Sequence, residues 1–193
     1  ETKQPDFVSY LFGRNEVFAK LPNDSAEVIM LGNSLTQNFE WSEMFRSVNI
    51  KNRGINTDIT KGVIQRLDEV IESKPKKIFI EIGINDIRRN YLMDSIFSNY
   101  VKIIETIKYE SPTTKIYIQS LFPSNKSTNN KILELNKRLY DYCIENNITF
   151  IDLYSSFVSG EILNPIYDCG DNLHLSGAGY LEWCRLIHDY VYE

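Results

Sequence analysis

The sequence is poor in the residues on which several kinds of functional site depend. Its only cysteines are Cys143, Cys169 and Cys184, and no CxxC pair occurs, which excludes a zinc ribbon and a thioredoxin-like motif. No apolar stretch approaches the ~18 residues that a membrane-spanning helix needs. The sequence has 21 basic and 26 acidic residues, and the basic residues form no Lys/Arg-rich stripe. We therefore expect no nucleic-acid-binding surface.

Motifs for nucleotides, metals and cofactors are also missing. There is no GxGxxG after a predicted strand, no P-loop and no HExxH, so we predict neither a cofactor nor a metal site. The chain begins at Glu1 instead of Met. A removed signal peptide would explain this and would place the protein in the periplasm or outside the cell, whereas a chain shortened for expression would begin in the same way.

Apolar runs alternate along the chain with segments of helical periodicity, which predict helices over 59–71, 96–107, 132–143 and 181–191. Strands are predicted at 27–32, 47–54, 76–83, 115–121 and 148–154, several of them near-continuous Val, Ile, Phe and Tyr. This alternation predicts an α/β fold, a three-layer α/β/α sandwich around a mostly parallel five-stranded sheet. Because there is no repeat and no Gly/Ser linker, we predict one domain over 1–193, with residues 1–25 as an N-terminal arm packed on it.

Polar segments follow several of the predicted strands. They read "GNSLT", "NRGINTD" and "GINDIRRN", and a fourth, "DCGDNLHLSG", precedes the last predicted helix. Ligands of open parallel sheets bind beyond the carboxyl ends of the strands, so these turns are the places to look for chemistry.

Ser34 has two possible roles. With Gln37 three residues later, it has the form of a capping box, in which a serine side chain satisfies the first N–H groups of a helix. At a strand-to-helix turn, its hydroxyl would also lie beside free backbone N–H groups that suit a developing oxyanion. Ser34 can be a nucleophile only if a base is available.

The sequence has two histidines, and they differ in their surroundings. His188 falls inside the last predicted helix, where an exposed structural role is expected. His174 lies in an irregular segment with Asp171 three positions before it. This pair can be a simple turn followed by Ser176 as a helix cap. Alternatively, Asp171 orients the imidazole of His174, which accepts the Ser34 proton.

Two further residues are candidates for binding an oxyanion. Gly54 follows the second predicted strand, where it can serve a strained turn or let its N–H approach a substrate oxygen. Asn85 follows the third strand in "GIND", where it can belong to a turn or donate from its neutral amide.

Together, "GNSLT", Gly54, "GIND" and "DNLH" resemble the four blocks of the SGNH hydrolase superfamily, the GDSL esterases and lipases. The resemblance covers nearly the whole chain and implies a flavodoxin-like sandwich. It implies Ser34 as nucleophile, His174 as base and Asp171 as its partner. It also implies an oxyanion hole of the Ser34 and Gly54 N–H groups and the Asn85 side chain.

One position departs from this pattern. The first block reads GNS where the name-giving form is GDS, so Asn33 stands in place of a carboxylate. In this respect the chain is more similar to the platelet-activating-factor acetylhydrolase-like and carbohydrate acetylesterase-like branches. GxSxG, the nucleophile motif of α/β-hydrolases, is missing because Thr36 stands where the second glycine would be.

These observations predict a serine esterase that removes a short acyl group, acetyl above all, from a small-molecule or glycan ester. The carbohydrate part of this prediction comes mostly from the resemblance. Asn33, Arg88 and Arg89 are possible substrate-binding residues, although a solvated basic helix start would also explain the two arginines. The alternatives are a lysophospholipase or thioesterase, and a non-catalytic glycan-binding domain of the same fold. The sequence indicates no oligomeric state.

Overall fold

A parallel sheet forms the centre of the computed structural model, which describes residues 7–24, 26–46 and 48–193. Its strands are β1 (Val28–Gly32), β2 (Ile50–Gly54), β3 (Lys77–Glu81), β4 (Lys115–Gln119) and β5 (Thr149–Ile151), in the order β2-β1-β3-β4-β5. In register, Gly32 pairs with Gly54 on one side and with Glu81 on the other. From β1 the chain passes to β2 on one side and then to β3 on the other, so the strand order reverses at β1. Such a switch point is where open α/β sheets bind ligands.

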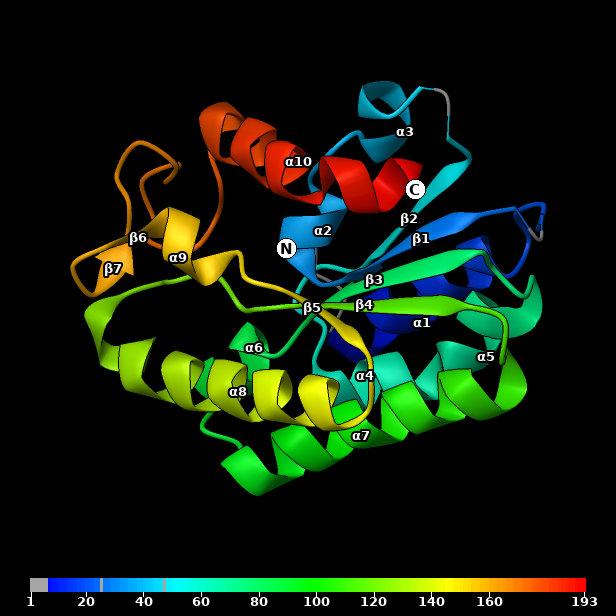
Figure 1. Ribbon diagram of the computed structural model, residues 1–193, viewed down its shortest axis with the longest axis horizontal. Helices are drawn as coiled ribbons and strands as arrows, with labels where there is room; N and C mark the ends of the chain where they lie inside the picture. The colour runs from blue at the N-terminus through cyan, green and yellow to red at the C-terminus, as the bar shows by residue number, and fades with distance from the viewer. Residues whose placement is uncertain (1–6, 25, 47) are drawn as a thin grey trace, which may run out of the picture.

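Helices cover both faces of the sheet (Figure 1). One face carries α2 (Ser34–Gln37), α3 (Trp41–Met44) and α10 (Gly177–Tyr192). The other carries α4 (Thr60–Gln65), α5 (Leu67–Glu72), α6 (Ile84–Arg88), α7 (Met93–Glu110) and α8 (Lys126–Glu145). The remaining elements are α1 (Phe7–Phe18), α9 (Tyr154–Phe157) and a hairpin of β6 (Val158–Ser159) and β7 (Ile162–Leu163).

Two apolar cores lie on the two faces of the sheet because strand residues alternate between them. Ile78 and Ile80 point to the α7 and α8 side, whereas Phe79 points to the α10 side and stacks on Tyr117 at 4.5 Å between ring centroids. Trp183 of α10 is fully buried against this second face. Burial on both faces explains the near-continuous apolar runs of the strands and confirms the predicted α/β/α sandwich.

The elements differ from the sequence prediction in several details. Each predicted strand exists but is shorter, because buried residues beyond its end, such as Ile82 and Leu121, continue the apolar run without pairing in the sheet. The helical pattern from 59 to 71 is two helices that break at Arg66, and the β6–β7 hairpin was not predicted. The predicted N-terminal arm includes residues 1–6 and 25, which lie outside the described residues. Within it, Phe18 is buried under the Arg53 guanidinium of β2.

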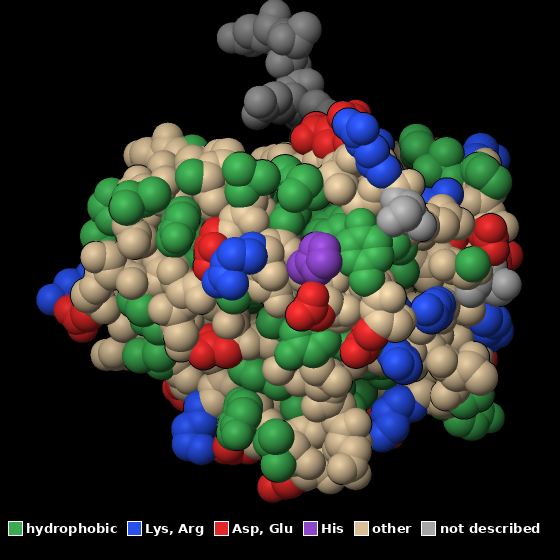
Figure 2. Space-filling view, turned by 45° about the horizontal axis from the view of Figure 1, so that its top comes forward, with side chains coloured by type: hydrophobic (Ala, Val, Ile, Leu, Met, Phe, Trp, Pro, Cys, Tyr) green, Lys and Arg blue, Asp and Glu red, His purple; other side chains and the backbone are tan. Residues whose placement is uncertain are grey.

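Within the described ranges, none of the helices has both the length and the apolar character needed to cross a bilayer. On the face shown in Figure 2, acidic and basic side chains are interspersed among hydrophobic and uncharged ones.

Candidate active site

Ser34 is the first residue of α2, directly beyond the carboxyl end of β1. The predicted capping box places the wrong residue at the N-cap of this helix. The side chain of Asn33, not that of Ser34, accepts a hydrogen bond from the Leu35 N–H at 2.9 Å. Since Asn33 performs the capping, the hydroxyl of Ser34 is left for other partners. Asn33 is also fully buried, so it is not the substrate-binding residue that we predicted.

The structure brings Ser34, His174 and Asp171 together across 140 residues of sequence. Ser34 Oγ lies 3.0 Å from His174 Nε2, and His174 Nδ1 lies 2.6 Å from Asp171 Oδ2. A carboxylate beside Nδ1 favours the tautomer with its proton there, which leaves Nε2 to accept the Ser34 hydroxyl proton. A hydroxyl, a base and a carboxylate that orients the base, connected in this order, are the arrangement that a serine nucleophile needs.

Asp171 is held by the backbone as well as by the imidazole. Its Oδ1 accepts the N–H groups of Leu173 and His174, at 3.0 and 2.8 Å. Partial burial raises the pKa of Asp171, but the hydrogen bonds from His174 and Leu173 outweigh it and lower this pKa to about 2. Asp171 is therefore a carboxylate at neutral pH.

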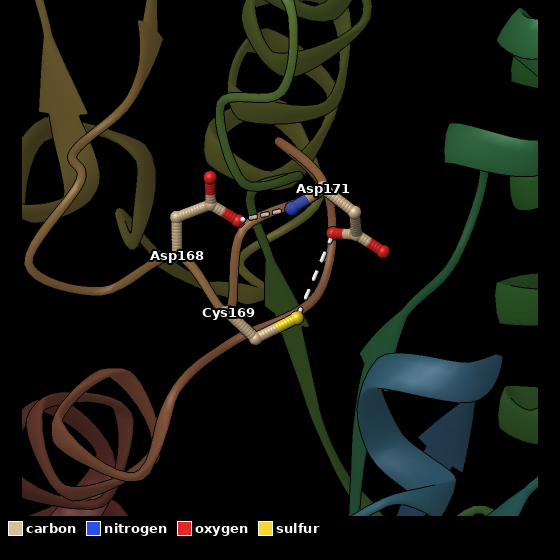
Figure 3. A group of neighbouring side chains, drawn as sticks. All are labelled: Asp168, Cys169 and Asp171. Carbon is tan, nitrogen blue, oxygen red and sulfur yellow. Dashed lines mark hydrogen bonds between the residues drawn. The ribbon is translucent and has the colours of Figure 1, made fainter.

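The loop before His174 gathers three side chains that can ligate metals, Asp168, Cys169 and Asp171 (Figure 3). Asp168 Oδ1 accepts the N–H groups of Gly170 and Asp171, and Cys169 Sγ lies 3.8 Å from Asp171 Oδ1. The Cys169 N–H also donates to the His174 carbonyl. These bonds explain the cluster as the turn that presents His174, with Ser176 as the N-cap of α10.

Gly54 lies at the end of β2, but its N–H already has a partner. It donates to Asn52 Oδ1 at 2.9 Å, so it is not free to bind an oxyanion as we predicted. The glycine is required for a different reason. A Cβ at Gly54 would lie 2.3 Å from the backbone N of Gln37 and 2.8 Å from the carbonyl O of Asn33, both on or next to α2. Gly54 therefore lets α2 pack closely on β2.

Asn85 lies in the first turn of α6, beyond the carboxyl end of β3. Its Nδ2 donates to the main-chain carbonyl of Asp58 at 2.9 Å, which fixes the amide plane and leaves its second N–H available. Gly83 precedes this helix with φ at 122°, a conformation that only glycine adopts readily. Since β3 is paired with β1, Asn85 and Ser34 follow neighbouring strand ends.

Thr57 is a candidate that sequence reasoning missed. It adopts φ of 62°, in the left-handed region where a β-branched residue is unusual, and its N–H makes no hydrogen bond to another described residue. On one side of it, the Asn56 N–H donates to Gln37 Oε1 of α2; on the other, the Asp58 carbonyl accepts from Asn85. The sequence could not identify this position, because a threonine does not predict a left-handed backbone conformation.

The remaining predicted residues lie outside the triad. Arg89 donates to the carbonyl of Thr57 at 3.1 Å, so it borders the same loop, and Arg88 is exposed on α6. His188 is an exposed residue of α10 that contacts Asp189, in agreement with the structural role predicted for it.

Comparisons with known proteins agree with this geometry. The sequence profile described as the GDSL-like Lipase/Acylhydrolase family matches residues 30–181. Platelet-activating factor acetylhydrolase IB subunit alpha2 of Rattus norvegicus is 27% identical over 177 residues, which cover 86% of this chain and 76% of that protein.

Solved structures share the fold. A GDSL-like lipase from Bacteroides thetaiotaomicron is 26% identical, with a TM-score of 0.85 over 94% of this chain and 97% of that one. A catalytic mutant of Axe2, an acetylxylan esterase from Geobacillus stearothermophilus, is 18% identical, with a TM-score of 0.73 over 88% and 95% of the two chains. With the profile spanning most of the sequence, the chain belongs to the GDSL-like lipase/acylhydrolase family of ester hydrolases.

Proposed function

We propose that the protein is a serine esterase that hydrolyses a short acyl ester, in particular an acetyl ester, through an acyl-Ser34 intermediate. The observation that carries the proposal is the continuous chain of contacts from Ser34 Oγ to His174 Nε2, at 3.0 Å, and from His174 Nδ1 to Asp171, at 2.6 Å. A helix cap needs no such base, whereas a nucleophile does.

The reaction follows from these contacts. His174 Nε2 takes the hydroxyl proton as Ser34 Oγ attacks the ester carbonyl, and Asp171 stabilises the imidazolium that forms. The tetrahedral intermediate collapses, the alcohol leaves with the proton from His174, and the acyl group remains on Ser34. A water molecule, deprotonated by His174, then attacks the acyl-enzyme and releases the carboxylic acid.

The oxyanion needs donors that are free before the substrate arrives. We assign this role to the N–H of Ser34, which is at the start of α2, and to the second amide N–H of Asn85. The Thr57 N–H is the third donor, in place of the Gly54 N–H that is bonded to Asn52. Strain at Thr57 is of the kind that is found at functional sites.

The proposed acyl group is acetyl. Both the platelet-activating factor acetylhydrolase and the acetylxylan esterase are named for acetyl groups on different alcohols, and the second is related by fold alone. We favour a sugar hydroxyl as the leaving alcohol. Arg89, held beside the site by the Thr57 carbonyl, and Arg88 would meet an acidic group on such a substrate.

Kinetics with activated esters test this proposal. Ser34→Ala should remove the hydrolysis of a p-nitrophenyl ester and leave the melting temperature within a few degrees, while the exposed Ser42→Ala control keeps full activity. An unchanged rate in Ser34→Ala would overturn the assignment. Acetyl esters should turn over faster than octanoyl esters. The opposite order would favour a lysophospholipase or thioesterase, and no turnover at all would favour a glycan-binding domain.

A further inference from the structure

A buried arginine joins the segments that carry the proposed oxyanion donors. Arg66 interrupts the helical pattern between α4 and α5, with φ of −119° and ψ of 11°. Its side chain is 2% exposed. One edge of the guanidinium, Nε, donates to Asp58 Oδ2 at 2.9 Å, and Nη2 donates to the carbonyl O of Gly32 at 3.1 Å.

The Gly32 carbonyl is the last one of β1 before the nucleophile turn. Besides Arg66, it accepts the N–H of Ile55 at 3.1 Å, and Ile55 begins the loop that leads to Thr57. Both lone pairs of this oxygen are thereby used. The position of the turn at Ser34 therefore depends on the loop after β2 and on the Arg66 guanidinium.

Asp58 connects Arg66 to Asn85. Its side chain pairs with Arg66, and its main-chain carbonyl accepts the Asn85 amide at 2.9 Å. The fit around this carboxylate is tight, because a Cβ on Gly62 would lie 1.9 Å from Asp58 Oδ1. Asp58 therefore has little freedom to move while Arg66 holds it.

From these contacts we propose that Arg66 is a positioning residue, which fixes the Asn85 amide relative to the Ser34 turn by holding the Gly32 carbonyl and Asp58 in one fork. The proposal rests on the proposed esterase function. The planar guanidinium group of an arginine can hold two acceptors at a fixed separation, which the single ammonium group of a lysine cannot do.

A purely stabilising role explains the arrangement less well. Two charges removed from water regain their desolvation cost only with excellent geometry, and an apolar pair of the same volume is often as stable. What an apolar pair lacks is the directional hold on two particular acceptors that border the site, the Gly32 carbonyl and the Asp58 carboxylate.

The test compares Arg66→Lys, Asn85→Ala and the double variant in ester hydrolysis. We expect Arg66→Lys to lower kcat ~10-fold with little change in KM, and Asn85→Ala to lower kcat ~100-fold, as the loss of one oxyanion donor does. If Arg66 acts through Asn85, the double variant stays within ~3-fold of Asn85→Ala. Losses that multiply to ~1,000-fold, or an unchanged kcat in Arg66→Lys, would overturn the proposal.

Arg53→Lys is the matched control. Arg53 is another buried arginine, paired with Glu69 at 2.8 Å, and its side chain packs on Phe18 instead of on the site loops. It should lower the melting temperature as much as Arg66→Lys while kcat stays within ~2-fold, since each variant disturbs one buried arginine–carboxylate pair.

A readout without turnover separates this proposal from the proposed function. The side-chain amide signals of Asn85 in an NMR spectrum, identified by their loss in Asn85→Ala, should shift in Arg66→Lys and stay in place in Arg53→Lys. Unshifted signals in Arg66→Lys would overturn the positioning role, even if the protein hydrolysed no ester. Absence of esterase activity in the wild type with a clear shift would overturn only the proposed function.

Discussion

At the scale of single residues, the proposed chemistry depends on how His174 is held. Its ring lies between Ser34 and Asp171, and its own N–H donates back to Asp171 Oδ1, so ring and backbone are fixed by one carboxylate. Two bonds to one group leave the imidazole little freedom to turn away from the hydroxyl. This is the preorganisation that general-base catalysis needs.

Asp171→Asn tests whether the Asp171 carboxylate orients His174. The amide would stabilise the wrong tautomer of His174, so we expect kcat to fall by roughly 100- to 10,000-fold with the fold intact. Asp189→Asn, next to the exposed His188, is the matched control and should have no effect. A loss below ~3-fold in Asp171→Asn would show that the carboxylate does not orient the base.

The pKa of Asp171 also has a consequence for acid stability. Because this pKa is lowered from 3.8 to about 2 in the folded protein, the stabilisation it gives is complete above about pH 4 and is lost as the pH falls through about 2. As the pH falls from about 4 to about 2, the separation between the unfolding curves of the wild type and Asp171→Asn should therefore shrink. A separation that stays constant across this range would contradict the shift.

Gly54→Ala tests the close approach between β2 and α2. The added methyl would meet backbone atoms of Gln37 and Asn33, which cannot rotate away, so we expect a loss of about 1–3 kcal/mol in the free energy of unfolding. Gly13→Ala, in an open position of α1, should instead be neutral or stabilising. Chemical denaturation of both variants distinguishes the two, and equal stabilities would refute the proposed packing.

The sequence was informative about side-chain chemistry and less so about the backbone. Ser34, His174 and Asp171 could be proposed as a triad because their residue types have few roles in that combination. The cap at Asn33, the occupied N–H of Gly54 and the left-handed Thr57 could not, since each depends on backbone geometry that the residue type does not reveal.

At the scale of elements, β3 carries an unusual buried acid beneath the active site. Glu81 is fully buried at the carboxyl end of this strand, and neither carboxyl oxygen has a partner among the described residues. Gln119 ends the neighbouring strand on the same face, where it accepts a hydrogen bond from Trp183 while its Nε2 lacks a partner in the same part of the structure. Burial raises the pKa of Glu81 to about 8.

Glu81→Gln should therefore change how stability depends on pH. An unfolded Glu81 ionises near pH 4.5 and the folded one near pH 8, so the folded state binds more protons between these values and stability falls as the pH rises through them. The glutamine variant lacks this slope and should gain at least ~1 kcal/mol relative to the wild type between pH 5 and 8. Glu145→Gln, at an exposed position of α8, is the control. Parallel curves for the wild type and Glu81→Gln would contradict this.

The elements themselves were largely predictable. Strand cores were correct because burial on both faces leaves an unbroken apolar run, and α7, α8 and α10 were correct because each has one apolar stripe. The break between α4 and α5 was not, because the apolar period continues across Arg66 while that side chain turns inward.

At the scale of the whole molecule, the last helix is joined to the sheet at both of its ends. The N-terminal end of α10 follows the His174 loop, and its C-terminal end meets Lys77 at the start of β3. Lys77 is fully buried, and its Nζ donates to the carbonyls of Tyr190, Val191 and Glu193. These bonds satisfy carbonyls that a helix end leaves open.

Lys77→Met separates stability from catalysis. It removes the donor from those carbonyls at the end of the sheet opposite the active site, so we expect a loss of about 1–3 kcal/mol in the free energy of unfolding. The kcat of the folded variant should stay within ~2-fold of wild type, because the triad is untouched. Lys76→Met, which removes one exposed contact to Glu193, is the control and should stay within ~0.5 kcal/mol. A lower kcat at full folding would refute this separation.

Covalent labelling measures most directly whether Ser34 is the activated nucleophile that we propose. Incubation with a fluorophosphonate, followed by intact-mass and peptide analysis, should give one adduct per chain, located on Ser34 and absent in Ser34→Ala. Labelling should also be far slower in His174→Ala, because the base would be missing. An adduct on another residue, or no adduct in the wild type, would contradict the account.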